Sequence, residues 1–151
     1  MSEFLAWLEA SRLGHLMRDS GVWTYAFVNL AHILGLSTLF GAALVLDLRL
    51  LGCWRRISWE AIAEPAERVA SLGLGLALVT GVALLATKAT EYAGNAFLWW
   101  IKFPAIALGL VNVWLWKRLV APSEARMKWF GATSLLCWLI AVAAGRMTAY
   151  W

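Results

Sequence analysis

The feature that most constrains this chain is a run from Val22 to Leu46 in which Asn29 and His32 are the only strongly polar side chains. As a helix, with a rise of about 1.5 Å per residue, this run covers a hydrocarbon core of roughly 30 Å. It therefore predicts a transmembrane helix. Three further apolar runs follow, and we expect spans at about residues 22–46, 68–87, 97–116 and 129–150.

The composition agrees with this expectation, because 62% of the side chains are hydrophobic and only 15% are charged. A soluble domain of this size is less apolar and carries more charge. We expect one integral membrane domain over residues 1–151, all-α in class. The net charge of +4 does not indicate nucleic-acid binding, because the basic residues flank the apolar runs, where topology and anionic lipids account for them.

The residues before the first run predict a short amphipathic helix. Between about residues 3 and 19, large apolar side chains and charges recur at helical spacing, which is typical of a helix lying in the membrane interface. The stretch lacks the apolar core and cleavage site of a signal peptide. The expected fold is a membrane four-helix bundle with an N-terminal interfacial helix. Pro65 fits an early position of the second span, and Pro104 is expected to kink the start of the third.

Small residues and cysteines add two expectations. Gly73, Ala77 and Gly81 form a ridge along the second span, which another helix can approach closely. Cys53 and Cys137 have no C-x-x-C spacing, so we expect two reduced packing thiols rather than a metal site or a disulfide.

The distribution of Lys and Arg predicts the orientation in the membrane. The first and third connections carry eight basic residues: Arg49, Arg55, Arg56, Arg68, Lys117, Arg118, Arg126 and Lys128. The opposite side carries three: Arg12, Arg18 and Lys88. By the positive-inside rule, the first and third connections are cytoplasmic, and both termini lie on the outer side.

With this topology, three intramembrane polar residues fall in the same leaflet half. His32 lies about 15 Å from the outer end of the first span, and Lys102 and Arg146 lie closer to the outer ends of the third and fourth. Asn29 and Gly35 share the helix face of His32. An ionisable side chain in a span is costly and normally has a partner or a ligand, so these residues form a candidate site.

A second stripe lies on the third span, where Lys102, Ala105, Gly109 and Asn112 recur at helical spacing.

Structural interpretations stand beside the functional one. His32 is also explained as a neutral histidine hydrogen-bonded to a neighbouring helix, and Lys102 and Arg146 as side chains that extend to the outer headgroups. We expect Asp47 and Arg49 to anchor the cytoplasmic end of the first span. His15 is expected at the membrane interface, and Glu91 is expected to pair with Lys88 or Lys102.

The functional interpretation is that His32 is the axial ligand of a haem between the helices, since a neutral imidazole is the usual ligand in four-helix membrane cytochromes. Lys102 and Arg146 would then pair with the haem propionates, with Tyr25 and Tyr150 as hydrogen-bond donors. No other histidine lies in a span. The iron would therefore be five-coordinate, or bound in addition by Met147 or by His15 folding in from the interfacial helix.

Several motifs resemble an uncharacterised bacterial family of small four-helix membrane proteins. These are the run Ala31–Gly35, Gly41, the segment Asp47–Leu50, Thr80–Gly81, and Ala89–Ala93 leading to Lys102. More distantly, the same positions are similar to haem-containing membrane protoporphyrinogen oxidases and to copper resistance protein D. In that oxidase family a histidine of helix one, linked to haem b, and a lysine of helix three are required. The resemblance assigns those roles to His32 and Lys102, and it implies the bacterial inner membrane.

The sequence therefore leads to one main functional hypothesis with alternatives. The main one is a haem b-binding inner-membrane protein with a redox role, either in electron transfer or in oxidation of a porphyrin-like or quinone-like substrate, with Lys102 as the catalytic residue. The first alternative is a non-enzymatic membrane subunit, or a homo-oligomer, that packs through the small-residue ridge and a polar His32–Asn29 contact. The second is a small transporter. The four methionines are scattered, which argues against copper transport.

Overall fold

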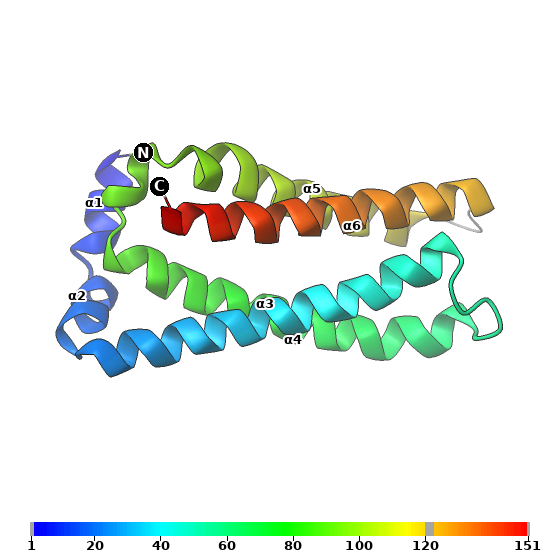
Figure 1. Cartoon of the computed structure of the whole chain (residues 1–151), viewed down its shortest axis with the longest axis horizontal. Coiled ribbons are helices and arrows are strands. Elements are labelled where there is room, and N and C mark those ends of the chain that lie inside the picture. Colours follow the sequence, from blue (N-terminus) through cyan, green and yellow to red (C-terminus); the bar gives the residue numbers. More distant parts are fainter. Residues whose placement is uncertain (1, 120–122, 151) are drawn as a thin grey trace. The chain divides into compact units, whose positions relative to one another are not determined.

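The structure is a computed structural model in which residues 2–119 and 123–150 are described; Met1, residues 120–122 and Trp151 lie outside this part. The described part is helical and contains no strand (Figure 1). Four segments are long and apolar enough to cross a membrane: α3 (Val22–Leu51), α4 (Trp59–Thr87), Phe97–Arg118 and α6 (Glu124–Met147). The expected all-α class with four spanning-length helices is confirmed.

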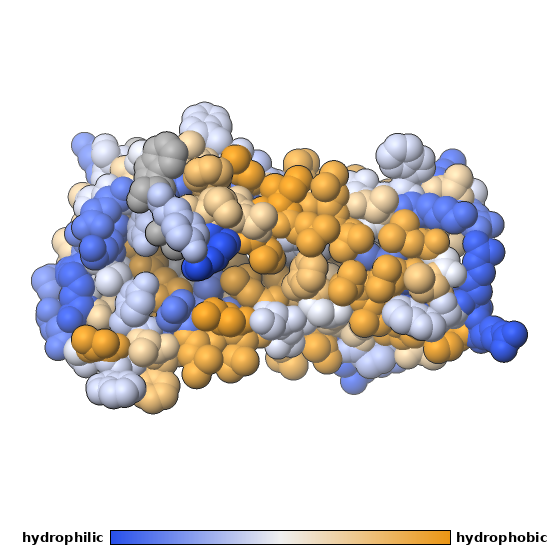
Figure 2. All heavy atoms as spheres, in the orientation of Figure 1, coloured by the Kyte–Doolittle hydropathy of each residue, from blue (hydrophilic) through white to orange (hydrophobic). Residues whose placement is uncertain are grey.

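Large apolar side chains point outward along these helices. Leu72 and Val79 of α4 are 74% and 72% exposed, and Leu108 in the third span is 61% exposed. In water such side chains would be buried, whereas lipid is their natural surrounding. Figure 2 shows hydrophobic side chains along the middle of the helices and hydrophilic ones at their ends. The chain is a multi-pass membrane protein.

The second span begins earlier than expected. The Ser58 hydroxyl accepts a hydrogen bond from the Ala61 N–H at 3.3 Å, and α4 starts directly after it, at Trp59. A serine before the first turn is a favourable helix cap. Pro65 therefore lies inside α4, where it has no N–H for the carbonyl four residues before it, and the expectation of an early position is wrong.

The third span starts with a wide helical turn. Residues Phe97–Lys102 form this turn, in which the Phe103 N–H bonds to the Leu98 carbonyl five residues back. The regular helix α5 (Phe103–Arg118) continues directly from this turn, with Pro104 in its first turn, where the ring has no N–H for the preceding helical carbonyls. The irregularity expected at Pro104 thus occurs just before it.

The N-terminal stretch is two helices rather than one. These are α1 (Ser2–Glu9) and α2 (Arg12–Asp19). The Ser11 hydroxyl donates to the Leu8 carbonyl at 2.6 Å and accepts from the Gly14 N–H at 3.3 Å, so it ends α1 and caps α2. In Figure 1, α1 and α2 run across the ends of α3 and α4.

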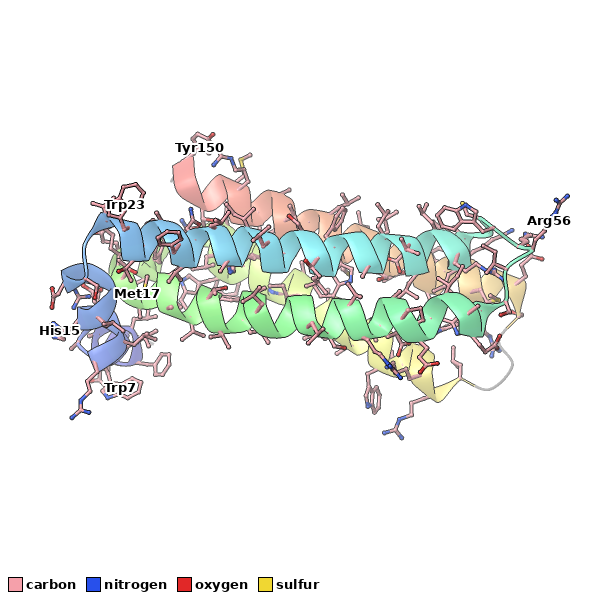
Figure 3. The ribbon with its side chains drawn as sticks, turned by 90° about the horizontal axis from the view of Figure 1, so that it is seen from below. Trp7, His15, Met17, Trp23, Arg56 and Tyr150 are labelled. Atoms are coloured by element: carbon pink, nitrogen blue, oxygen red, sulfur yellow. The ribbon has the colours of Figure 1, made fainter. Side chains whose placement is uncertain are left out.

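The chain divides into two compact units, of which the first consists of Met1–Leu39 and Ser71–Asn95. In this unit the Arg18 guanidinium donates to the Thr87 carbonyl at 3.2 Å and to the Glu9 carbonyl at 2.8 Å, joining the ends of α4 and α1. The Glu9 carboxylate accepts two hydrogen bonds of 2.7 Å from the N–H and hydroxyl of Thr90. Figure 3 shows Met17 of α2, which is buried, pointing toward the long helices.

The second unit consists of Phe40–Ala70 and Ala96–Trp151. In it α5 and α6 lie side by side, and the stripe expected on the third span faces α6. A methyl group on Gly109 would lie 3.4 Å from the Trp138 ring, and the Asn112 amide donates to the Phe130 carbonyl at 3.1 Å. This stripe therefore forms the contact between α5 and α6.

Candidate functional site

His32 bonds across to α4. Its Nδ1 lies 3.0 Å from the Thr80 hydroxyl oxygen, and Thr80 is 8% exposed. The same hydroxyl oxygen lies 2.6 Å from the Leu76 carbonyl, one turn earlier in α4. These three groups form a chain of hydrogen bonds that runs from α3 into the backbone of α4.

The chain of hydrogen bonds assigns the tautomer of His32. A hydroxyl has one proton, and the short contact to Leu76 shows that Thr80 donates it to that carbonyl. Thr80 must then accept from His32, so Nδ1 carries the imidazole proton. In a neutral imidazole the other nitrogen, Nε2, has a lone pair. The nitrogen that a metal would use is therefore the unprotonated one.

Small residues let the two helices approach around His32. A methyl group on Gly81 would lie 3.1 Å from His32 Cε1, so the ring occupies the space that a side chain would fill. A methyl group on Gly35 would meet the Ala77 nitrogen at 2.8 Å, and one on Gly73 would meet the Leu39 nitrogen at 2.5 Å. The expected close approach to the small-residue ridge is confirmed, and the helix that approaches is α3 of the same chain.

Asn29 lies three residues before His32 on the same face of α3, and Tyr25 lies a further four residues before Asn29. Asn29 is half-buried, and within residues 2–119 and 123–150 its amide makes no hydrogen bond. Tyr25 is 43% exposed and lies close to Tyr92 in the turn after α4. Burial, and to a smaller extent Tyr25, raises the pKa of Tyr92. The face therefore offers an unsatisfied amide one turn from the imidazole.

Lys102 and Arg146 belong to the second unit. Lys102 is half-buried against α6, where a methyl group on Gly145 would lie 3.4 Å from its Nζ. In the described part of the chain no carboxylate pairs with it. Arg146 donates to the Tyr150 hydroxyl at 2.6 Å, and its guanidinium lies over the Tyr150 ring. Lys102 thus lies beside the residue that precedes Arg146. That these two cations meet the His32 group stays a prediction.

His15 does not fold in toward His32. Its Nδ1 lies 3.7 Å from the Asp19 carboxylate, its side chain is 61% exposed, and Figure 3 shows it pointing away from α3 and α4. Glu91 pairs with Lys88 at 3.1 Å, which was the first of its two expected partners. Residues 2–119 and 123–150 contain no group of three or more His, Cys, Asp or Glu side chains suited to a metal ion.

Sequence reasoning missed Asp47. We expected it to anchor a helix end with Arg49, but its side chain is buried, at 3% exposure, and Arg49 donates to the Ile57 carbonyl at 3.0 Å instead. The expectation for Asp47 is therefore wrong. Ala43, Asp47 and Leu50 recur at helical spacing and all lie on the buried face of α3, but the sequence gives no signal for this face, because α3 is apolar on its other faces as well.

A family model matches residues 4–151, and its description is a family of unknown function, DUF6644. The chain belongs to this family. The expected membership in a family without an assigned function is confirmed. Searches of the curated proteins and of the solved structures give no match.

Proposed function

We propose that this protein binds haem b in the membrane, with His32 Nε2 as an axial ligand, and that it has a redox role. The observation that supports the proposal most directly is the hydrogen bond from Nδ1 to Thr80. Haem-ligating histidines commonly donate their second ring N–H to a nearby acceptor, which fixes the tautomer and orients the ring. The Thr80 hydroxyl does this for His32.

The other polar residues have roles that suit the same ligand. The Asn29 amide, which has no hydrogen bond within the described residues, lies one turn from His32 and can bond to a polar group at the edge of the haem. Lys102 and Arg146 would be the cations for the propionate groups, and Lys102 would also face an anionic, porphyrin-like or quinone-like substrate. Bound haem would supply a one-electron centre. The distant similarity to membrane protoporphyrinogen oxidases selects His32 and Lys102 for the corresponding roles.

The proposal includes a location. The chain would lie in a bacterial inner membrane with both termini in the periplasm, and with the first and third connections in the cytoplasm, as the eight basic residues there indicate. The substrate site near Lys102 would then open toward the periplasmic half of the bilayer.

An absorption spectrum of the full chain in detergent, oxidised and then dithionite-reduced, tests the proposal. We expect a Soret band that shifts on reduction when the protein is produced with added haem precursor. His32→Ala should abolish this band, whereas His15→Ala, which removes the exposed histidine of α2, should leave it unchanged. Absence of the band in the wild-type protein, or full haem content in His32→Ala, would refute the proposal.

A second candidate is a membrane subunit without a cofactor. The observation that favours it is that the His32–Thr80 bond is itself a contact between α3 and α4. Polar bonds of this kind stabilise membrane helices by about 0.6 kcal/mol on average. Because the small-residue ridge lies against α3 of the same chain, a partner or a second copy would need another surface. Under this hypothesis His32→Ala lowers thermal stability while no chromophore is present in either protein.

A further inference from the structure

The carboxyl of Asp47 is buried, and such burial is costly unless a partner or a proton compensates it. It lies in the second unit, on α3, and its Oδ2 atom is buried with no hydrogen-bond partner among the described residues. On the side of α6, the Ser134 side chain is its hydrogen-bonding neighbour. One turn before Ser134, a methyl group on Gly131 would meet the Asp47 carbonyl oxygen at 2.9 Å. The backbones of α3 and α6 are therefore in close contact at this point.

Within the described ranges, no ion pair joins a cation to this carboxyl, and three basic residues near it in sequence or in the adjoining connections are paired elsewhere. Arg49 bonds to the Ile57 carbonyl, and Arg55 and Lys128 pair with Glu124. The groups that face Asp47 from α6 are the Ser134 hydroxyl and the Cys137 thiol, which is 7% exposed. Asp47 thus has neutral neighbours.

An ionised carboxylate in such surroundings costs several kcal/mol, and a side chain avoids this cost most easily by taking up a proton. A metal cation would require further ligands, such as a second carboxylate, a histidine or a cysteine thiolate. The described part of the chain contains no cluster of three or more such side chains. The chemistry of the site therefore favours a proton over any other cation.

We propose that Asp47 is a proton-binding site inside the membrane domain, which holds its proton near neutral pH and exchanges it with water at the adjacent end of α3. The exchange path is short. The helix ends at Leu51, four residues or about 6 Å further along the axis, and the exposed Cys53 and Trp54 follow. The site is independent of His32 and of any cofactor there.

Infrared difference spectroscopy tests the proposal on the full chain in lipid. Near neutral pH, wild type minus Asp47→Asn should show the carbonyl stretch of a protonated carboxyl, and this band should shift in D₂O. As the pH rises into the alkaline range, the band should fall and then recover when the pH is returned. The matched control is Asp19→Asn, which makes the same change at a 73% exposed carboxyl and should remove no such band at neutral pH.

Three infrared outcomes would overturn the proposal. Absence of the band near neutral pH would mean that the carboxyl is ionised. A band that does not shift in D₂O would mean that the proton does not exchange with water, and a band that persists unchanged to the alkaline limit would mean that the carboxyl does not release it.

A second measurement needs no variant and so remains decisive if Asp47→Asn does not fold. Dicyclohexylcarbodiimide adds to protonated carboxyls in apolar sites: the carboxyl proton moves to a carbodiimide nitrogen, the oxygen bonds to the central carbon, and rearrangement gives a stable N-acylurea. Near neutral pH, mass spectrometry of digested protein should find this adduct on Asp47 and not on Asp19 or Glu124. If the exposed carboxyls are labelled and Asp47 is not, the proposal fails.

Discussion

The Thr80 hydroxyl carries two hydrogen bonds, and the direction of each matters for His32. Because its proton goes to the Leu76 carbonyl, it accepts from Nδ1 and keeps the imidazole in one tautomer. The identity of residue 80 therefore controls which nitrogen of His32 can bind a ligand. This control acts through one oxygen atom, so it can be removed while the shape of the side chain is kept.

Thr80→Val should separate the hydrogen bond from the packing. The variant leaves the Nδ1–H without its acceptor, and we expect a loss of about 0.5–2 kcal/mol in the free energy of unfolding. Thr87→Val is the matched control, because Thr87 also bonds to a carbonyl of its own turn, at 3.2 Å, but does not meet His32. Thermal unfolding in detergent measures both. Equal losses in the two variants would contradict the role assigned to Thr80.

His32 and Asp47 show what could be predicted at the scale of a residue. His32 stands out in the sequence because an ionisable group in a long apolar run is rare. Asp47 lies near a helix end, where a charge is ordinary, so the sequence does not distinguish it from Arg49. Its burial depends on which face of α3 meets Gly131 and Ser134 of α6. That choice is made by tertiary packing and cannot be derived from a single helix.

Within the first unit, α3 and α4 contact each other through backbone atoms. Gly35 and Gly73 face each other so closely that a methyl group on Gly73 would lie 2.8 Å from the Gly35 carbonyl oxygen. Such contacts are the usual way for membrane helices to gain packing, because lipid offers no hydrophobic drive for association. Here the contact also fixes the distance between His32 and Thr80.

Gly73→Ala should force the two helices apart, because the added methyl would meet backbone atoms of Leu39 that cannot rotate away. We expect a loss of about 1–3 kcal/mol, as for overpacked cores. Gly75→Ala is the control: nothing lies within 4 Å of its added methyl, and alanine is the better helix former by up to about 1 kcal/mol. If the midpoint of thermal unfolding shifts equally in the two variants, Gly73 does not lie in a close contact between α3 and α4.

The helices themselves were predictable, but their ends were less so. Spans of suitable length follow from apolar composition alone, because any helix crossing a bilayer must have it. The break at Ser11 and the start of α4 after Ser58 depend on single hydroxyl groups bonding to one N–H each. The same serines could also lie within a helix and bond to a preceding carbonyl, so the sequence permits both.

The contact between α1 and the turn after α4 should depend on pH. The Thr90 backbone N–H, and then its hydroxyl, lower the pKa of the Glu9 carboxyl. A lowered pKa in the folded state means that the unfolded chain binds the proton more readily. The contact therefore contributes its full stability above the ordinary glutamate pKa of about 4.3. This contribution is lost as the pH falls through the lower pKa of the folded state.

Glu9→Gln should remove this dependence. We expect proteolysis between α1 and α2 to increase for the wild type only at acidic pH, and to be higher for Glu9→Gln already at neutral pH. Glu3→Gln, which changes an exposed carboxyl of the same helix, serves as the control. A wild-type cleavage rate that does not change between neutral and acidic pH would show that Glu9 does not hold the contact.

At the scale of the whole chain, each of the two units contains contacts between segments that connect different helices. In the second unit Arg55 of the first connection pairs with Glu124 at the start of α6, and Lys117 at the end of α5 pairs with Glu67 at 2.8 Å. In the first unit Glu9 bonds to Thr90, between α4 and the third span. Within the second unit, the first and third connections therefore meet, and within the first unit the N-terminal helices meet the second connection.

Which end faces the cytoplasm can be measured with a native residue. Cys53 lies in the first connection and is exposed, whereas Cys137 is buried in α6. The basic residues predict that Cys53 is cytoplasmic. A thiol reagent that cannot cross membranes should therefore label the protein in inverted inner-membrane vesicles and leave it unlabelled in intact spheroplasts. In Cys53→Ser the vesicle signal should vanish, because Cys137 is inaccessible from either side.

A second label on the opposite face makes the result independent of reagent access. Ser2→Cys, in a Cys53→Ser background, places a thiol on the exposed first residue of α1, which the topology predicts to be periplasmic. This variant should be labelled in spheroplasts and protected in sealed inverted vesicles, the reverse of the wild-type pattern. If Cys53 reacts in spheroplasts and Ser2→Cys in vesicles, the orientation is inverted. Lys102 and Arg146 would then lie in the cytoplasmic half, and a periplasmic substrate for the His32 site would be excluded.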